Sequence, residues 1–265
     1  MKKMLPAALM MLAACSKKDA PVTPRPTEPV WKLTEIAGAG ESTFFYYNNA
    51  GEPSAWTTRT TSGTDSSAVA WAGGKLVFTY LFFGQQQRID RSFLYTGDRL
   101  TRVQYHNFDH SGQWTVTDYD SLVYNGNRLA ELHVVNAGAR NQLFKLYWEG
   151  GNVARCESFD VIAETIVLTG IIKYQYTDQP ALARVFPPWC YFIWTGRDFA
   201  ALSENERSVE EGSSAIGTLR WRNSYGHAYL TGGRLESMSW RREDFSAPAT
   251  ADFARQFAYQ LYQTQ

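Results

Sequence analysis

One motif recurs along most of the chain: an aromatic residue, a glycine turn and an apolar residue at fixed spacing. It is clearest in Tyr95-Thr-Gly-Asp-Arg-Leu100, Tyr124-Asn-Gly-Asn-Arg-Leu129 and Trp148-Glu-Gly-Gly-Asn-Val153. Looser copies begin at Tyr47, Trp71, Tyr176 and Leu230. The apolar position falls at 76, 100, 129, 153, 182 and 235, which gives steps of 24, 29, 24, 29 and 53 residues. The last step is two repeats with one copy lost in an insertion, so the chain is a repeat protein.

Each copy of the motif predicts a β-hairpin. Thr-Gly, Asn-Gly and Gly-Gly supply the positive φ angles of tight hairpin turns, and the flanking residues alternate in polarity. The period leaves room for two strands per repeat, which is too short for a propeller blade, and the pattern of a leucine-rich repeat is missing. We therefore expect an all-β fold, an antiparallel meander of tandem hairpins with about ten to fourteen strands that forms a curved sheet or an open barrel.

The first residues have the features of an export signal. Lys2 and Lys3 precede a short apolar stretch, which ends in Leu12-Ala-Ala-Cys15. This ending resembles the lipobox of bacterial lipoproteins, in which the cysteine thiol is acylated before cleavage. We expect residues 1–14 to be a signal peptide and Cys15 to be the lipidation site, with an ordinary secretory signal as the alternative.

A spacer follows the cysteine. Four prolines lie between Ser16 and Val30 among threonine and charged residues, so residues 15–30 are expected to form a semi-extended, lipid-anchored linker. The resemblance to lipoproteins implies the outer membrane, because Ser16 stands where an aspartate would mark inner-membrane retention. Residues 31–265 are predicted to form a single domain, anchored to the membrane through lipid alone.

The net charge of the chain argues against one class of partner and identifies no other. The 26 basic and 26 acidic residues give a formal charge of zero, which becomes minus two when the two signal-peptide lysines are removed. Because nothing here makes a basic field, nucleic acid is not expected as a partner.

The hairpins resemble the YD-type repeats of large bacterial surface and toxin-encapsulating proteins. The whole chain is similar to bacterial outer-membrane lipoproteins of unknown function, which share a lipobox, a Pro/Thr spacer and tyrosine-ended hairpins. The resemblance includes an irregular stretch, here Phe186-Pro-Pro-Trp-Cys-Tyr to Leu202-Ser-Glu-Asn205, and a final strand near Gln256-Phe-Ala-Tyr259. It implies fold and location, with no catalytic residues. We expect a short irregular or helical excursion near 186–212, which includes the charge run Glu204 to Glu211.

Motifs of common enzymes and cofactor sites are missing from the sequence, so we expect no catalysis and no cofactor. His106-Asn-Phe-Asp109-His110 is the best metal candidate, with His133 and His227 as the other imidazoles. A polar hairpin tip is favoured over a metal site because Asp109 to Gly112 is itself a turn signal, and we assign no metal site.

Asp118 and Asp120 alternate around Tyr119 and would project from the same face of a strand. A pair of carboxylates in a cleft could act on a glycosidic bond, but a solvated strand face is the simpler interpretation.

Two features leave alternatives open. After lipidation, Cys156 and Cys190 could form a disulfide or stay as two buried thiols. Six of the nine tryptophans could form a ligand platform or pack as cross-strand pairs and core: Trp56, Trp114, Trp189, Trp194, Trp221 and Trp240.

The sequence thus predicts a non-catalytic, lipid-anchored envelope protein that binds or scaffolds a protein or glycan partner. The alternatives are a surface glycan hydrolase or glycan-binding protein, in which Asp118, Asp120 or the Glu204 to Glu211 run supplies carboxylates, and a purely structural envelope lipoprotein.

Overall fold

The computed structural model describes residues 30–83, 86–108, 114–137, 140–163, 165–186, 189, 192, 195–247 and 249–262. Sixteen strands and two short 3-10 helices lie within these residues. The strands are β1 Val30–Gly38, β2 Glu41–Tyr47, β3 Pro53–Thr60, β4 Gly63–Ala72, β5 Lys75–Phe83, β6 Gln86–Thr96, β7 Arg99–Phe108, β8 Trp114–Asn125, β9 Arg128–Val135, β10 Asn141–Glu149, β11 Asn152–Ile162, β12 Thr165–Pro180, β13 Asn205–Ser214, β14 Leu219–Tyr229, β15 Leu235–Asp244 and β16 Ala249–Tyr262. The helices are η1 Leu182–Val185 and η2 Phe199–Leu202. None of the described helices has the length and apolar character needed to cross a membrane.

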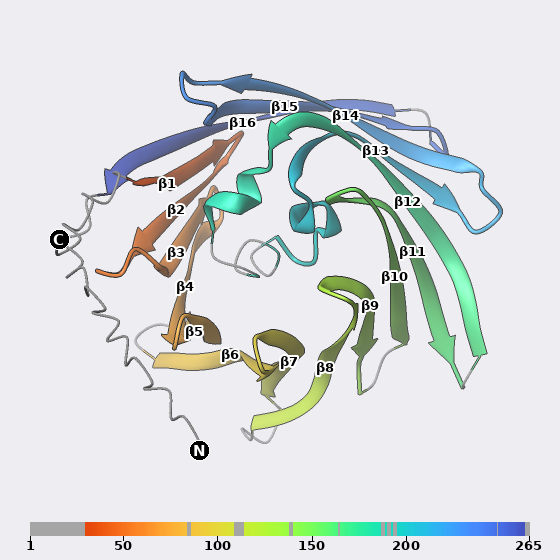
Figure 1. Ribbon diagram of the computed structural model, residues 1–265, viewed down its shortest axis with the longest axis horizontal. Coiled ribbons are helices and arrows are strands. Elements are labelled where there is room, and N and C mark those ends of the chain that lie inside the picture. The colour runs from red at the N-terminus through yellow and green to blue at the C-terminus, as the bar shows by residue number, and fades with distance from the viewer. Residues whose placement is uncertain are drawn as a thin grey trace, which may run out of the picture.

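The strands form a closed antiparallel barrel. Each pairs with its neighbour in the sequence, and β16 returns to pair with β1 (Figure 1). The all-β hairpin meander predicted from the repeats is confirmed. It has more strands than expected, and the sheet closes on itself, which leaves no full-length edge strand.

The motif has a defined role in the hairpins. In four copies the aromatic residue lies opposite the apolar residue five positions later, and a register shift precedes it: Trp71 and Leu76, Tyr95 and Leu100, Tyr124 and Leu129, Trp148 and Val153. The turn glycines Gly97, Gly126 and Gly150 have φ angles of 59°, 60° and 56°, the left-handed region that favours glycine. The apolar partners are almost completely buried. The repeat therefore fixes both the turn and the inward direction of the side chain that follows.

The aromatic residue also ties each hairpin to the one before it. The Tyr124 hydroxyl donates to the Leu100 carbonyl over 2.7 Å, and the Trp148 indole nitrogen donates to the Leu129 carbonyl over 2.8 Å. The Tyr176 hydroxyl donates to the Val153 carbonyl in the same way. The basic residue of the motif reinforces the link, since Arg99 lies 5.8 Å from the ring centroid of Tyr124. Arg99, beside the turn of one hairpin, therefore stacks on the aromatic residue of the next repeat.

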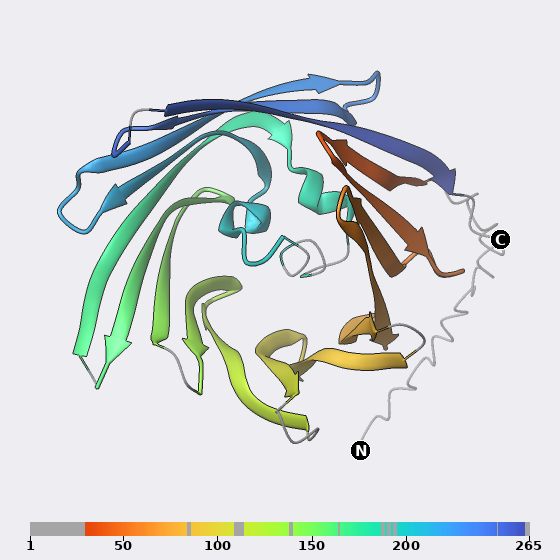
Figure 2. The same cartoon turned by 180° about the vertical axis from the view of Figure 1, so that it is seen from behind.

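Between β12 and β13 the chain leaves the wall and enters the barrel. We call the described residues of this segment, 181–186, 189, 192 and 195–204, the plug. Figures 1 and 2 show this segment, with η1 and η2, in the middle of the ring of strands. The excursion expected near 186–212 begins and ends earlier. From Asn205 onward the chain is strand β13, because most of the predicted charge run Glu204 to Glu211 pairs with β12 and β14.

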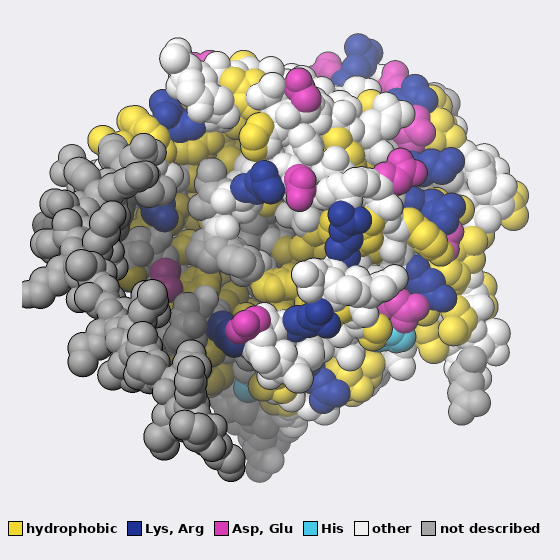
Figure 3. All heavy atoms as spheres, in the orientation of Figure 1, with side chains coloured by type: hydrophobic (Ala, Val, Ile, Leu, Met, Phe, Trp, Pro, Cys, Tyr) yellow, Lys and Arg dark blue, Asp and Glu magenta, His cyan; other side chains and the backbone are white. Residues whose placement is uncertain are grey.

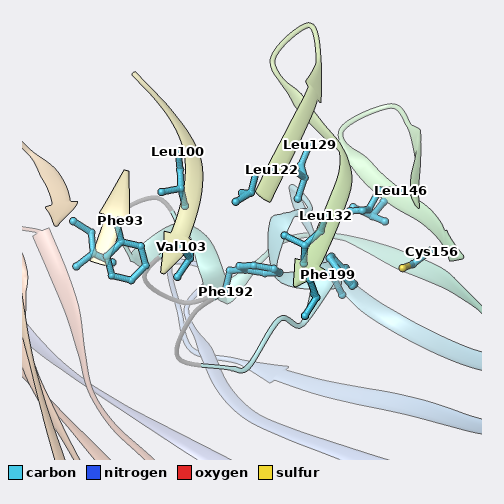
Figure 4. Packing of buried hydrophobic residues seen from close by; sticks show 14 of the residues in the cluster. Phe93, Leu100, Val103, Leu122, Leu129, Leu132, Leu146, Cys156, Phe192 and Phe199 are labelled. Atoms are coloured by element: carbon cyan, nitrogen blue, oxygen red, sulfur yellow. The ribbon is translucent and has the colours of Figure 1, made fainter. Parts of the chain in front are cut away.

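The core lies inside the barrel, around the plug. One cluster joins strands β4 to β12 to Phe192, Phe199 and Ala200 of the plug. Figure 4 shows Phe192 and Phe199 among leucines of the wall. A smaller cluster joins β1, β2, β15 and β16 to Leu182 and Phe186. The plug therefore supplies apolar side chains to both clusters.

The outer wall carries charged side chains. Leu132 and Val134 point into the core, so Glu131 and His133, which alternate with them, point outward. The same reasoning places Arg155 and Glu157 on the outside, on either side of the buried Cys156. Ion pairs link these outward residues, among them His133–Glu131 at 2.9 Å and Arg155–Glu157 at 3.4 Å. Figure 3 shows acidic and basic side chains interspersed on the β10–β13 side of the molecule.

Candidate binding site at the barrel rim

Several residues proposed from the sequence cannot be placed. Cys15, Asp109, His110, Cys190 and Trp194 lie outside the described residues, as does the side chain of Trp114. His106 Nε2 lies 3.0 Å from Ser92 Oγ, and His133 pairs with Glu131 on the outer wall. The described residues therefore do not bring these two imidazoles into one site.

Trp56 and Trp189 of the proposed platform pack against the core. Trp56 contacts both apolar clusters. Trp189 makes edge contacts with Tyr124 and Phe192, with ring centroids 6.3 and 5.9 Å apart. These two tryptophans contribute to the junction between plug and wall.

Trp221 and Trp240 lie on neighbouring strands in the part of the barrel made by β13 to β16. The Trp221 indole covers Gly212, where a Cβ atom would collide with the ring, and Arg242 lies 5.1 Å from its centroid. Trp240 is stacked between Tyr225 and Phe253, with centroid distances of 6.3 and 4.9 Å. Arg255 lies 5.5 Å from the same indole. Phe253, Trp240 and Tyr225 begin an aromatic ladder that continues to His227 and Tyr229.

The ladder faces the barrel interior. Met238 packs against the inner cluster of β1, β2 and β16, and Trp240 follows it by two positions on the same strand. Phe257 is buried in that cluster, so Arg255 and Phe253 share its inward face.

A cavity of about 740 Å³ adjoins the ladder at the β1–β2 turn, and we call it the rim cavity. Its apolar lining includes Ile36, Trp240 and Phe253, and its charged lining includes Glu41 and Arg255. Because consecutive strands run in opposite directions, the β1–β2 turn lies at the end of the barrel opposite the β10–β11 turn. The plug is bound to that β10–β11 turn, where the Glu204 amide donates to the Gly151 carbonyl. The rim cavity therefore lies at the end of the barrel opposite the turn to which the plug is bound.

A second, smaller cavity of about 190 Å³ lies beside the plug and contains a charged triad. Two nitrogens of the Arg197 guanidinium donate to the Asp120 carboxylate, Nε to Oδ2 over 2.8 Å and Nη2 to Oδ1 over 2.9 Å. The Tyr105 hydroxyl donates to Asp120 Oδ2 over 2.7 Å and accepts from Arg197 Nη2 over 2.9 Å. Burial, followed by the charge of Asp120, raises the pKa of Tyr105 to about 12, which keeps the hydroxyl protonated as a donor.

The triad corrects one interpretation of the sequence. Asp120 is 2% exposed, so it is not on a solvated strand face. Asp118 has partners of its own, since its carboxylate accepts from Asn107 Nδ2 and the Ala137 amide. A sequence pattern could not reveal the partner of Asp120, because Arg197 comes from the plug.

A cluster of polar side chains lies between the plug and strands β13 and β14 and connects them. Arg207 binds Asp198 of the plug over 2.8 Å, and Tyr225 donates to Glu210 over 2.9 Å. Glu206 accepts from the Leu182 amide at the start of η1, and burial raises its carboxyl pKa. Burial lowers the pKa of His227, whose Nε2 lies 4.0 Å from Glu206 Oε2.

Cys156 is a free thiol at 1% exposure in the core, where burial raises its pKa to about 12. Its suggested disulfide partner, Cys190, is outside the described residues.

Comparisons identify the fold. No protein-family model matches the sequence, and no curated protein sequence matches it either. The structure is similar to a porin-like protein from Bacteroides uniformis, with a TM-score of 0.54 and 8% identity over 87% of this chain and 95% of that one. A porin-like protein from Bacteroides vulgatus aligns with a TM-score of 0.38, 8% identity, and coverage of 86% and 99%. The structure of TcdB2-TccC3-TEV aligns with a TM-score of 0.31, 13% identity, and coverage of 80% and 10%. The first of these shows a shared barrel fold.

Sequence reasoning missed the other residues of the rim cavity. Phe253 and Arg255 alternate in Asp-Phe-Ala-Arg, which predicts an inward face for both on a strand, but neither belongs to the repeat motif. Glu41 joins them only because the barrel closes between β16 and β1.

Proposed function

We propose that this protein is a non-catalytic envelope lipoprotein whose barrel stands in water and binds a partner at the rim cavity. The observation that carries this proposal is the distribution of apolar and charged side chains across the barrel wall. The similarity to a porin-like fold is compatible with an envelope location.

The inner face of the wall has the opposite polarity to that of a membrane-spanning barrel. Barrels that cross a bilayer present an apolar band about 25 Å tall to lipid and enclose a polar interior. Here Leu100, Leu132 and Val153 are buried inside at 0% exposure, and the outward face of the same strands carries the ion pairs of Glu131 and Arg155. Each lysine or arginine at the bilayer midplane would destabilise a spanning barrel by about 2–4 kcal/mol. The wall therefore favours an aqueous surrounding. In this proposal the acylated Cys15 attaches the protein to the membrane.

Fractionation of a Cys15→Ala variant tests this proposal. The wild-type protein should sediment with membranes and need detergent for release, whereas the variant should be soluble and folded without detergent. Cys156→Ala, which removes a buried thiol and leaves the lipobox intact, is the matched control and should stay with the membranes. Cys15→Ala protein that remains in carbonate-washed membranes would show that the barrel itself is embedded.

Glycan binding is the second candidate, because aromatic rings line the rim cavity. Both faces of Trp240 are covered by Tyr225 and Phe253, so the exposed aromatic surface is that of Phe253, at 43% exposure. A glycan array probed with the full-length protein and with Phe253→Ala distinguishes the candidates. Signals that disappear in the variant would assign the cavity to a sugar ligand.

A further inference from the structure

Where β1 and β16 pair to close the barrel, β16 extends beyond the end of β1. β1 ends at Gly38, which lies opposite Arg255, and β2 begins beyond the turn at Glu41. β16 extends past Arg255 by six more residues, 249–254, which pair with β15 alone among the described strands. All six residues are exposed. We call the side of this segment that faces away from β15 the free edge.

A free edge is a template for another strand. Its backbone N–H and C=O groups are arranged for a ladder, and an added strand satisfies them. Proteins commonly protect such edges with lysine, proline or a bulge. The segment reads Ala-Thr-Ala-Asp-Phe-Ala, with Asp252 as its single charged residue and no lysine or proline, and its pairing with β15 is in continuous register from Gln256 to Ala249. At about 3.3 Å per residue, the free edge is roughly 20 Å long.

The rim cavity lies beside this free edge. Phe253 and Ala254 of the segment line it on one side, and Gly38 and Glu41 of the β1–β2 hairpin line it on the other. A strand added to the free edge would therefore point every second side chain into the cavity, toward Ile36, Trp240 and Phe253. Its intervening side chains would face water. The volume of about 740 Å³ is within the range of sites that enclose a small ligand.

We propose that the free edge binds an extended peptide segment of a partner protein by strand addition, with bulky apolar side chains at alternate positions inside the rim cavity. This inference rests on the proposed function, in that it assigns a ligand class to the same cavity.

Two other occupants fit less well. The chain's own spacer carries Pro21, Pro24, Pro26 and Pro29, and each proline lacks the N–H donor that a ladder needs. A second copy would offer its own free edge, whose inward side chains are Ala249, Ala251 and Phe253, so that a single large apolar group would enter the cavity. A separate peptide with several such groups matches the cavity better.

Selection from a peptide library tests the proposal. The full-length protein, purified in mild detergent and immobilised, would be panned against phage-displayed random nonapeptides. Selected peptides should be free of proline at their centre, with apolar residues at every second position. Synthetic versions with single N-methylated amides should lose affinity in a period of two, by about tenfold or more where the amide faces the free edge. Loss of affinity without that period, or no selected peptide, would overturn strand addition.

A pair of phenylalanine variants supplies the control. Phe253 and Phe245 are exposed to similar extents, 43% and 46%, but only Phe253 lines the rim cavity. Phe253→Ala should weaken the selected peptides by about tenfold or more, and Phe245→Ala should leave their affinity unchanged. Equal losses in the two variants would overturn the assignment to this cavity.

Two further results would replace the peptide with another occupant. A dimer in light scattering that dissociates in Phe253→Ala would identify a second copy. Glycan-array signals that depend on Phe253, with no peptide selected, would keep the binding function and overturn the peptide as its ligand. The fractionation of Cys15→Ala tests the location separately and does not affect these outcomes.

Discussion

Arg197 of the plug binds Asp120 of β8 through two hydrogen bonds of 2.8 and 2.9 Å, although 77 positions separate them in the chain. Arg197 is one of three described residues other than glycine with a positive φ, at 75°. An arginine in this conformation needs compensation from its surroundings. The bidentate contact with Asp120 supplies it and fixes the plug against the wall.

Asp120→Ala should destabilise the barrel because Arg197 would keep a half-buried charge without its partner. We expect a loss of about 2–3 kcal/mol in the free energy of unfolding, since the Arg197 side chain retains 31% exposure and is partly solvated. Urea denaturation measures the loss. Asp65→Ala, at an exposed position of β4, is the control and should change stability by less than about 0.5 kcal/mol. Equal effects of the two substitutions would contradict a locking role.

Tyr124→Phe tests the link between successive hairpins. Removal of the hydroxyl leaves the Leu100 carbonyl without its donor and should lower the free energy of unfolding by about 1 kcal/mol. Tyr46→Phe, at a tyrosine that is 47% exposed, should be neutral in the same thermal or urea titration. If Tyr124→Phe were also neutral, the hydrogen bond between repeats would be dispensable.

Gly212→Ala should destabilise the protein even though alanine suits a strand better than glycine. Its Cβ would collide with the Trp221 indole, and displacing the ring should cost about 1–3 kcal/mol. Gly63→Ala is the matched control, because nothing lies within 4 Å of the added atom, so it should be neutral or slightly stabilising. Thermal unfolding of the two variants provides the comparison, and a stable Gly212→Ala protein would contradict the packing of Trp221.

Cys156 should resist alkylation in the folded protein. Its thiol is buried and has a pKa of about 12, so almost no thiolate forms at pH 8. Mass spectrometry after iodoacetamide treatment should show no label on Cys156 until urea unfolds the chain. Rapid labelling of the native protein at pH 8 would contradict this burial.

His227 should make stability depend on pH on the acidic side. Burial lowers its folded-state pKa below the unfolded value of about 6.5, so the unfolded chain takes up the proton first. The stabilising contribution is present above that unfolded value and is lost as the pH falls from it through the folded pKa. His227→Gln should therefore lose less stability than the wild type between pH 7 and pH 5.5, measured by urea denaturation at each pH. Parallel losses would show that His227 does not titrate in this range.

The repeat motif determined the local structure. Residues such as Tyr124, Gly126 and Leu129 lie within six positions of one another, so the turn, the strand pairing and the inward leucine follow from short-range sterics and hydrophobic patterning. The all-β meander and the presence of an irregular excursion were predictable for the same reason. The number of strands was underestimated, because β13 is polar and lacks the motif.

Only the tertiary structure decided closure, the position of the plug and the site. Asp120 binds Arg197, and Glu41 lines the same cavity as Arg255, because the plug folds inward and β16 returns to β1. Both arrangements depend on contacts between residues far apart in the chain, whose energies depend on burial and geometry that a local pattern does not contain. The extension of β16 beyond the end of β1 is likewise a property of the closed barrel, set by the stagger of its strands.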